Sequence, residues 1–353
     1  MAGNPVWTRR CLVLSRISKT LATNGFEKHP KTQVFAQDIV EATTFNNAYS
    51  LNDRTRTFLK VQDGCDYSCT FCTIPLARGK SRSDTIENVL NSAREIAQNE
   101  VKEIVLTGVN TGDFGIRNGK REDKFIDLIT ALDQVEGIDR IRISSIEPNL
   151  LTEEIIQFTA SAHKFMPHFH IPLQSGSNKV LKSMKRRYKR ELYTERVEFI
   201  HQAIPDCCIG VDVIVGYPGE SDADFMETYN YLNELNVAYL HVFTYSERAN
   251  TLANEMDDIV PQKERAKRSK MLRSLSEKKR RFFYNKFAGT SRKVLFEKDV
   301  EGGKIHGYSD NYLRVAVKYS PELINQLCDI SLLEVNATGM MIGELAASEV
   351  SAV

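Results

Sequence analysis

Long hydrophobic runs, excess charge of one sign and internal repeats are all lacking in this chain of 353 residues. No apolar run approaches the roughly 18–20 residues that are needed to cross a bilayer, and no apolar segment of signal-peptide length lies near the first residues. The net charge is +1, so any nucleic-acid surface must be local. These absences predict a cytoplasmic globular protein without membrane contact, large enough for one large domain or two smaller ones.

Cysteine is scarce and unevenly placed. The chain has seven cysteines, and an odd number in a chain of this size argues against a disulfide framework. Three of them, Cys65, Cys69 and Cys72, form a C-x3-C-x2-C motif directly after a predicted strand. The other four are dispersed, with two adjacent ones expected at the start of a core strand and one in a C-terminal barrel: Cys11, Cys207, Cys208 and Cys328.

The spacing of the three clustered cysteines favours an iron–sulfur cluster. Thiolates are soft ligands that select zinc or iron–sulfur clusters, and zinc usually takes four protein ligands, often as two separated C-x2-C pairs. The sequence has no second pair and no nearby histidine. Three thiolates in one loop fit three irons of a [4Fe–4S] cluster and leave the fourth iron open. A set of buried free cysteines is the alternative, although thiols this close together are reactive unless they bind metal.

Two aromatic residues, Tyr67 and Phe71, stand between the cysteines. Their apolar bulk could shield a cluster from water and tune its potential. Ordinary loop packing explains them equally well, so the sequence leaves both interpretations open.

Repeated β-then-α units predict an α/β fold with a partial, open barrel. A full eightfold barrel needs about 250 residues, and here about 190 residues contain six predicted strands. The strands are expected at 57–61, 103–106, 140–145, 168–172, 209–215 and 239–243. Helices are expected at 86–98, 125–135, 152–159, 178–204 with a break near Arg187, and 222–235.

The residue composition and the predicted secondary structure both change after Pro261. Residues 262–286 contain eleven Lys or Arg and two Glu in a helical pattern. Several short strands then predict a small antiparallel barrel, with strands at 293–296, 304–307, 312–317, 329–335 and 340–344. We therefore expect an N-terminal arm or remnant of a missing domain at 1–50, a core at 51–285 and a small all-β barrel at 286–353.

Seven segments outside and around the cysteine motif give the chain a family resemblance. It resembles the radical S-adenosylmethionine (radical SAM) methylthiotransferases, most closely the branch that acts on N6-threonylcarbamoyladenosine at position 37 of tRNA. The likeness covers roughly residues 34–347, and residues 290–347 resemble the RNA-binding TRAM barrel of these enzymes. The segments are 53–56 (DRTR), 59–65 (LKVQDGC), 74–82 (IPLARGKSR), 103–110 (EIVLTGVN), 142–147 (RISSIE), 170–176 (HIPLQSG) and 212–220 (DVIVGYPGE).

The resemblance implies an activity and its cofactors. A [4Fe–4S] cluster would cleave S-adenosylmethionine into a 5′-deoxyadenosyl radical, with electrons from a donor such as flavodoxin or ferredoxin. The radical would remove the C2 hydrogen of adenosine 37 in the anticodon stem-loop, which then becomes the 2-methylthio derivative. Three alternatives stay open: isopentenyl-adenosine tRNA as the target, a ribosomal protein as the target, or an RNA-binding protein with a vestigial cluster.

The resemblance also implies site residues. Cys65, Cys69 and Cys72 would be the catalytic cluster ligands. Polar residues at the carboxyl ends of barrel strands face the active site, although any one of them could serve the loop alone, and Gly216 could be a turn glycine. The residues expected near the cofactor are Tyr67, Phe71, Thr107, Gly108, Ser145, Glu147, Gln174, Asp212 and Gly216.

One family feature is not found in the sequence. Family members carry an N-terminal domain with three more cysteines, which bind a second [4Fe–4S] cluster that donates the sulfur. Cys11, Cys207, Cys208 and Cys328 form no such set. We interpret the chain as a fragment or mis-started version of a full enzyme rather than one that has lost this half.

The basic 262–286 segment is a candidate RNA contact. Its charges could bind phosphates, which would give salt-dependent affinity without base readout, or they could form a solvated helix face. The residues expected to contact RNA are Lys278, Lys279, Arg280 and Arg281.

Overall fold

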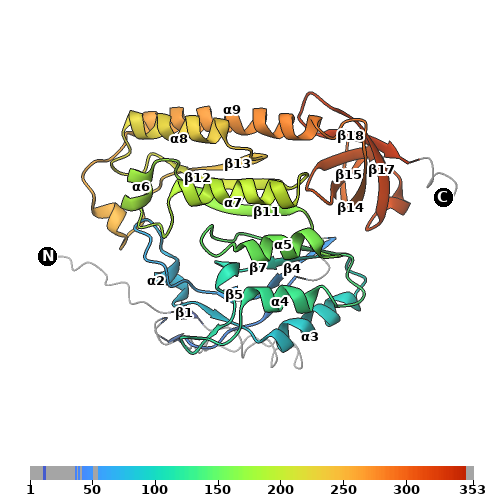
Figure 1. The fold of residues 1–353 in the computed structure, drawn as a ribbon, viewed down its shortest axis with the longest axis horizontal. Coiled ribbons are helices and arrows are strands. Elements are labelled where there is room, and N and C mark those ends of the chain that lie inside the picture. Colours follow the sequence, from blue (N-terminus) through green and yellow to red (C-terminus); the bar gives the residue numbers. More distant parts are fainter. Residues whose placement is uncertain (1–10, 13–35, 38, 40–41, 51–54, 347–353) are drawn as a thin grey trace, which may run out of the picture.

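The computed structural model describes residues 11–12, 36–37, 39, 42–50 and 55–346 (Figure 1). Most of the predicted N-terminal arm at 1–50 lies outside these residues. Within it, β1 (Cys11–Leu12) pairs antiparallel with β2 (Ala36–Gln37). None of the helices in the described part of the chain is long and apolar enough to span a membrane.

Six parallel strands form the predicted open barrel. The first three pair side by side, as do the last three, and the single bridges Ile141–Phe165 and Ser145–His170 join the two groups. The first strand pairs on its outer edge with the antiparallel β3 (Ala48–Tyr49). Among the described residues nothing pairs it with the sixth strand, so the barrel stays open there. The strands are β4 (Arg56–Lys60), β7 (Glu103–Thr107), β10 (Arg140–Ile143), β11 (His168–Gln174), β12 (Cys208–Val215) and β13 (Tyr239–Thr244).

Helices follow the strands and cover the outside of the barrel (Figure 1). Thr85, Thr152 and Ser221 each accept a hydrogen bond from the backbone three residues on, so each fixes the start of a helix. The break expected near Arg187 is confirmed, because two helices fill the 178–204 segment. The helices are α3 (Ile86–Ala97), α4 (Phe125–Leu132), α5 (Glu153–Ser161), α6 (Asn178–Ser183), α7 (Arg190–Ala203), α8 (Asp222–Glu234) and α9 (Gln262–Asn285).

The barrel core is one continuous apolar cluster between strands and helices. Helix α3 buries Val89, Ala93 and Ile96, which recur every three or four residues and so lie on one face. Cys207 and Cys208 are buried at the start of β12, as expected. The remaining elements of the core domain are short: β5 (Gln62–Asp63), α2 (Ile74–Arg78), β6 (Arg82–Ser83), η2 (Thr111–Asp113), β8 (Ile116–Arg117), β9 (Lys120–Arg121) and η3 (Leu252–Glu255).

The C-terminal part is a small closed barrel, as predicted. Five strands close in the order β14-β15-β16-β18-β17. Cys328 lies in one of them, also as expected. The prediction placed Tyr312 in a strand, but its backbone is left-handed (φ 67°) and its ring stacks on His168. The elements are β14 (Ser291–Glu301), β15 (Lys304–Ser309), β16 (Arg314–Lys318), η4 (Pro321–Leu323), β17 (Leu327–Val335) and β18 (Met341–Leu345).

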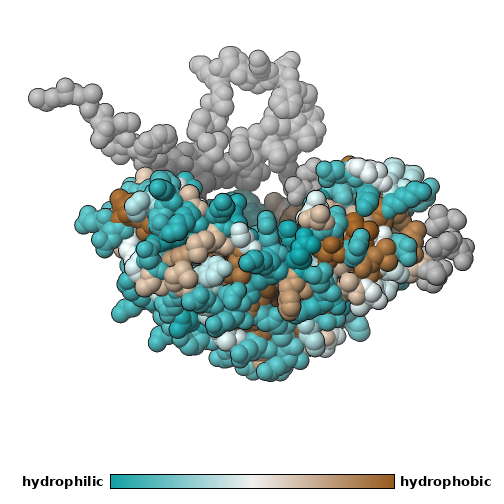
Figure 2. All heavy atoms as spheres, turned by 90° about the horizontal axis from the view of Figure 1, so that it is seen from above, coloured by the Kyte–Doolittle hydropathy of each residue, from teal (hydrophilic) through white to brown (hydrophobic). Residues whose placement is uncertain are grey.

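The small barrel packs against the amino ends of the core strands. Arg142 of β10 donates to the carbonyl oxygens of Ser309 and Asp310, both at 2.8 Å. Arg140 donates to the carbonyl oxygens of Tyr308 and Lys293. In Figure 1 the small barrel therefore lies at the end of the core opposite α2 and α6. Figure 2 shows a mostly hydrophilic face, with hydrophobic residues gathered at the end that carries the small barrel.

Candidate active site

The three clustered cysteines lie in a tight loop at the carboxyl end of β4. The loop runs from β5 to β6, two short strands that pair antiparallel and hold its ends together. Gly64 has a φ of 70°, and a side chain there would collide with the backbone of Lys80. The Cys65 N–H donates to the carbonyl of Gly79 at 3.1 Å. Glycine at 64 thus lets the chain return closely enough to fold the cysteines into one loop.

Each cysteine sulfur accepts a hydrogen bond from a nitrogen donor. The backbone N–H of Tyr67 donates to Cys65 Sγ, and that of Ile74 donates to Cys72 Sγ, both at 3.4 Å. Arg186 Nη1 donates to Cys69 Sγ at 3.0 Å. Donors of this kind stabilise thiolates and raise the potential of a cluster that they hold. The loop is therefore built for ionised sulfurs.

Burial opposes ionisation of these thiols when they are alone. It raises the pKa of Cys65 to about 12 and also raises that of Cys72. Both thiols therefore need a bound cation to lose their protons near neutral pH. This requirement fits a set of metal ligands better than a set of free cysteines.

His170, Asp212 and His241 form a further group of possible metal ligands, whose donor atoms all lie within 4.8 Å of one another.

Arg186 connects the cysteine loop to the third and fourth core strands, and the sequence interpretation missed it. It forms an ion pair with Glu147, which follows β10. Its guanidinium also lies 5.0 Å from the ring of Tyr188, whose hydroxyl donates to the carbonyl oxygens of Pro172 and Leu173 in β11. The available signal was its place in the expected helix break, where side chains leave the regular pattern.

Tyr67 and Phe71 prove to have different surroundings. Tyr67 is 5% exposed, accepts a hydrogen bond from Asn149 and carries the guanidinium of Arg187 at 3.9 Å over its ring. Its ring is thus fixed beside the cysteines, as a shielding role requires. Phe71 packs edge-on against Tyr217 in a separate apolar cluster, which agrees with ordinary loop packing.

The turn after β7 is tied to the cysteine loop by Gln62, which the sequence interpretation also missed. Gln62 Nε2 donates to the carbonyl of Gly64 at 2.8 Å, and its Oε1 accepts from the Asn110 N–H at 2.9 Å. A side chain at Gly108 would meet Gln62 at about 3.0 Å. Thr107 and Gly108 therefore lie next to the cysteine loop, where the resemblance placed them.

Ser145 and Asp212 both contact His170, inside the barrel and below the carboxyl ends of its strands. Ser145 Oγ lies 2.9 Å from His170 Nδ1, and Asp212 Oδ1 lies 2.8 Å from His170 Nε2. Asp212 Oδ1 is also 3.3 Å from His241 Nδ1. Burial alone would raise the pKa of Asp212, but the two imidazole contacts outweigh it and lower the pKa to about 2. Asp212 is thus an ionised group held between two histidines.

Gln174 ends β11 in a left-handed conformation with a φ of 69°. Such a backbone is uncommon for a residue other than glycine and is often found at ligand sites. Gly216, at the end of β12, has a simpler explanation. Its φ is 74°, its N–H donates to Glu220 at 2.7 Å, and a side chain there would collide with Arg265. These contacts agree with a turn glycine.

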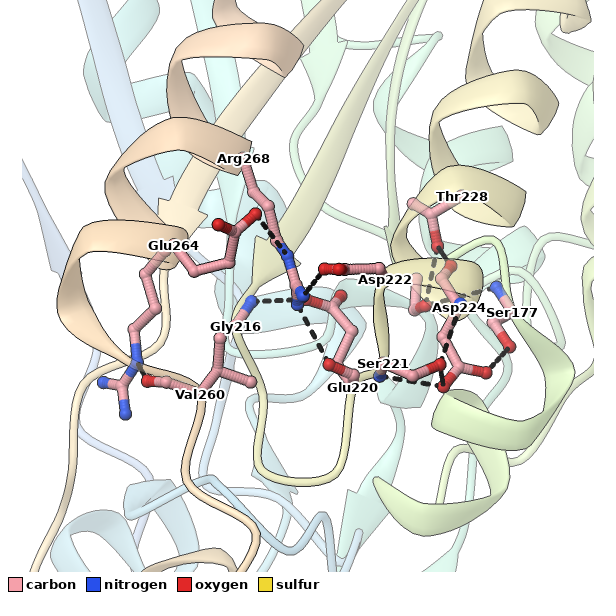
Figure 3. Close-up of polar contacts among 12 residues, drawn as sticks. Ser177, Gly216, Glu220, Ser221, Asp222, Asp224, Thr228, Val260, Glu264 and Arg268 are labelled. Carbon is pink, nitrogen blue, oxygen red and sulfur yellow. Dashed lines mark hydrogen bonds and ion pairs between the residues drawn. The ribbon is translucent and has the colours of Figure 1, made fainter.

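Helix α9 uses part of its positive charge inside the protein. Arg268 donates to the carboxylate and the carbonyl of Glu220 and pairs with Asp222 at 2.7 Å (Figure 3). Arg265 is also buried, and it donates to the carbonyl oxygens of Val260 and Tyr245. The charged residues in 262–286 therefore do not form a uniformly solvated face. Arg268 thus fixes α9 against the loop between β12 and α8. Arg265 fixes the start of α9 against Tyr245, which follows β13.

The four residues expected to contact RNA divide in the same way. Lys279 donates to the carbonyl oxygens of Asn233 and Leu235 at the end of α8, and burial lowers its pKa to about 8. Arg281 donates to the carbonyl oxygens of Asn336 and Ala337. Lys278 is exposed and Arg280 is half-buried.

Comparisons with known proteins agree with this geometry. Residues 59–232 match the Radical SAM superfamily. The threonylcarbamoyladenosine tRNA methylthiotransferase MtaB of Bacillus subtilis is 38% identical over 316 residues, which are 88% of this chain and 68% of that protein. The protein of the same name from Aquifex aeolicus is 42% identical and covers 68% of this chain and 58% of its own length. A tRNA-2-methylthio-N(6)-dimethylallyladenosine synthase of Trichlorobacter lovleyi is 33% identical over 83% of this chain and 66% of that protein.

The chain spans between 58% and 68% of the length of these three relatives. The matched region includes the cysteine loop and the six strands that surround it. The chain belongs to the radical SAM superfamily and, within it, to the threonylcarbamoyladenosine tRNA methylthiotransferase family.

Proposed function

We propose that the chain converts N6-threonylcarbamoyladenosine at position 37 of tRNA to its 2-methylthio derivative by radical SAM chemistry. The observation that carries the proposal is the cysteine loop, with three donor-supported sulfurs at the carboxyl end of the barrel. Family membership implies a [4Fe–4S] cluster and S-adenosylmethionine. The names of two relatives, the proteins of Bacillus subtilis and Aquifex aeolicus, supply the nucleoside.

Within this proposal the chain's own residues bind the cluster, orient its ligands and shield it from water. Cys65, Cys69 and Cys72 would hold three irons. The cluster, when bound, supplies the electron that cleaves S-adenosylmethionine to the 5′-deoxyadenosyl radical. Arg186 supports Cys69 with a charged hydrogen bond and holds Glu147 in place. Tyr67 excludes water from one side of the loop, because it is buried and fixed by Asn149.

The strand ends around the loop would form the cofactor site. Thr107, Gly108 and Glu147 lie next to the cysteine loop through Gln62 and Arg186. Gln174 and Gly216 end the next two strands on the same side of the barrel. Ser145 and Asp212 support the site from within the barrel. These roles follow the family resemblance and the position of each residue.

The RNA would have to extend along the core. The small barrel and the cysteine loop lie at opposite ends of it (Figure 1), and strands of four to eight residues at about 3.3 Å each separate those ends by roughly 20 Å. We propose that the small barrel and the exposed basic residues of α9, such as Lys278, bind the anticodon stem-loop. Adenosine 37 would then splay out toward the cysteine loop.

The sulfur atom and the electron come from elsewhere in this proposal. Cys207 and Cys208 are buried at the start of β12, and Cys328 lies in the small barrel. The family resemblance implies that a second [4Fe–4S] cluster donates the sulfur. A cytoplasmic donor such as flavodoxin or ferredoxin would supply the electron.

A hydrogen-transfer experiment tests the substrate without needing the sulfur donor. The reconstituted chain is incubated with S-adenosylmethionine, dithionite and an anticodon stem-loop that carries deuterium at C2 of adenosine 37. We expect deuterium in the released 5′-deoxyadenosine with the threonylcarbamoyl-modified RNA. Equal transfer from the isopentenyl-modified RNA would favour the second target. Release of 5′-deoxyadenosine without deuterium from either RNA would contradict the proposal.

A further inference from the structure

The interior of the open barrel is built in three layers. The lowest layer is aromatic: His168 Nε2 lies 2.9 Å from the Tyr239 hydroxyl, and the His168 ring stacks on Tyr312 of the small barrel at 4.1 Å. Tyr239 fills the space that a side chain at Gly210 would occupy. The floor of the barrel is thus closed by side chains, and the layers above it are reached only from the carboxyl end or the open edge.

The middle layer is a polar network around Asp212. Oδ1 of Asp212 lies 2.8 Å from His170 Nε2 and 3.3 Å from His241 Nδ1. Ser145 Oγ lies 2.9 Å from His170 Nδ1, so both ring nitrogens of His170 have a partner. His241 contacts Asp212 through Nδ1, and among the described residues no hydrogen bond engages its Nε2.

Two side chains of β13 are exposed at the open edge of the barrel: His241 in the middle layer and Phe243 in the upper layer. Side chains two residues apart in a strand lie on the same face, so Phe243 stands above His241 on the inner face of β13. The His241 side chain is 52% exposed, and Phe243 is also 52% exposed. Phe243 pairs in register with Ile214, which packs in the same cluster as Phe71 of the cysteine loop. An exposed aromatic ring and an exposed imidazole thus share the inner face of β13, with Phe243 nearer the end of the barrel that carries the cysteine loop.

We propose that Phe243 and His241 form the subsite that receives the target nucleobase, which deepens the proposed function and rests on it. Phe243 offers a flat apolar face on which a purine stacks. His241, positioned by Asp212, offers Nε2 for a hydrogen bond with the edge of the base. Among the described residues no strand pairs with the outer edge of β13, so the base would enter from that side.

A metal site is the alternative use of these residues. Two imidazoles and a carboxylate are also a common set of ligands for divalent iron or zinc. Here both imidazoles lie close to the same atom, Oδ1 of Asp212, at 2.8 and 3.3 Å. These direct contacts need no bridging ion, and they do not involve the second nitrogen of His241.

Binding of stem-loop RNAs that carry either adenosine or an abasic site at position 37 tests the subsite. For the parent chain we expect the abasic RNA to bind about 10-fold more weakly, since one stacked base contributes roughly that much. Phe243→Leu and His241→Gln should reduce this ratio toward one, whereas Phe243→Trp should keep it. His201→Gln is the matched control, because His201 lies outside the barrel on α7.

The abasic RNA also reports on folding, since every folded variant should bind it with the parent affinity. A Phe243→Leu or His241→Gln protein that keeps the parent's 10-fold ratio would overturn the subsite. A metal ion beyond the cluster iron, lost in His241→Gln and kept in His201→Gln, would overturn it in favour of a metal site. No binding of either RNA to the parent chain would instead count against the proposed function.

Discussion

The two ends of the core barrel each carry a pair of arginines, and the two pairs differ in the groups that they contact. At the amino end, Arg140 and Arg142 donate to four carbonyl oxygens of the small barrel. At the carboxyl end, Arg186 donates to a cysteine sulfur and Arg187 covers the ring of Tyr67. An arginine whose partners are carbonyl oxygens stabilises the fold, whereas one whose partner is a cluster ligand supports the chemistry. The partner, and not the residue type, decides the role.

This difference has consequences for how each end responds to change. At the amino end, Arg142 also pairs with the fully buried Glu103 at 2.9 Å. Loss of a partner there leaves a buried charge and should lower stability. The carboxyl end surrounds a cofactor site, so loss of a donor there should alter the cluster more than the fold.

The largest expected effect is at the carboxyl end. Cys69→Ala should abolish the cluster, because the cluster would lose one of its three protein ligands. The control is Cys328→Ala, which changes a cysteine of the small barrel. Iron and sulfide analysis after anaerobic reconstitution should give about four of each in the parent and the control. A Cys69→Ala protein with the parent's iron content would refute the assignment of the loop.

The second effect sharpens the contrast between the arginine pairs. Arg142→Met should lower the free energy of unfolding by about 3 kcal/mol, because Glu103 is left buried with only the longer 4.0 Å contact to Arg56. Arg187→Met should cost about 1 kcal/mol or less, since its contacts are at the surface. Urea unfolding compares the two. Equal losses would show that the two ends do not differ in this way.

Sequence reasoning recovered the local structure and missed the long-range contacts. The six strands, the helix break near Arg187 and the small barrel follow from periodicity and turn residues, which are local. The docking of that barrel on Arg140 and Arg142 depends on contacts between residues more than 150 positions apart, which no local pattern encodes. The same limit explains why Gln62 and Arg186 were missed.

The basic segment shows a second limit. Charge counts in 262–286 are the same whether a side chain faces RNA or a carbonyl oxygen inside the protein. The structure separates Arg265 and Arg268, which are buried, from Lys278, which is exposed. It also shows that Phe283 and Tyr284 of α9 pack in the core of the small barrel. Removing residues 287–353 would therefore expose apolar surface, and single substitutions are the better test.

A smaller effect is expected when the donor to Cys69 is removed. The double variant Arg186→Met/Glu147→Gln removes the charged hydrogen bond without leaving Glu147 unpaired. The cluster should form, but its reduction potential should fall by on the order of tens of millivolts, because the sulfur loses a positive partner. A redox titration followed by electron paramagnetic resonance measures this. An unchanged potential would mean that Arg186 serves the fold alone.

The smallest effect concerns the exposed end of α9. If Lys278 contacts a phosphate, Lys278→Ala should flatten the plot of log affinity against log salt by about 0.7–0.9. Lys263→Ala, an exposed lysine in the first turn of the same helix, is the matched control. Equal slopes for the parent and Lys278→Ala would place this charge in solvent.

The central claim is that the carboxyl end of the barrel generates a radical from S-adenosylmethionine. The most direct measurement is the release of 5′-deoxyadenosine by the reconstituted chain with S-adenosylmethionine and dithionite, quantified by chromatography and mass spectrometry. We predict release from the parent chain and none from Cys69→Ala. A parent protein that holds about four irons and releases no 5′-deoxyadenosine would contradict the account.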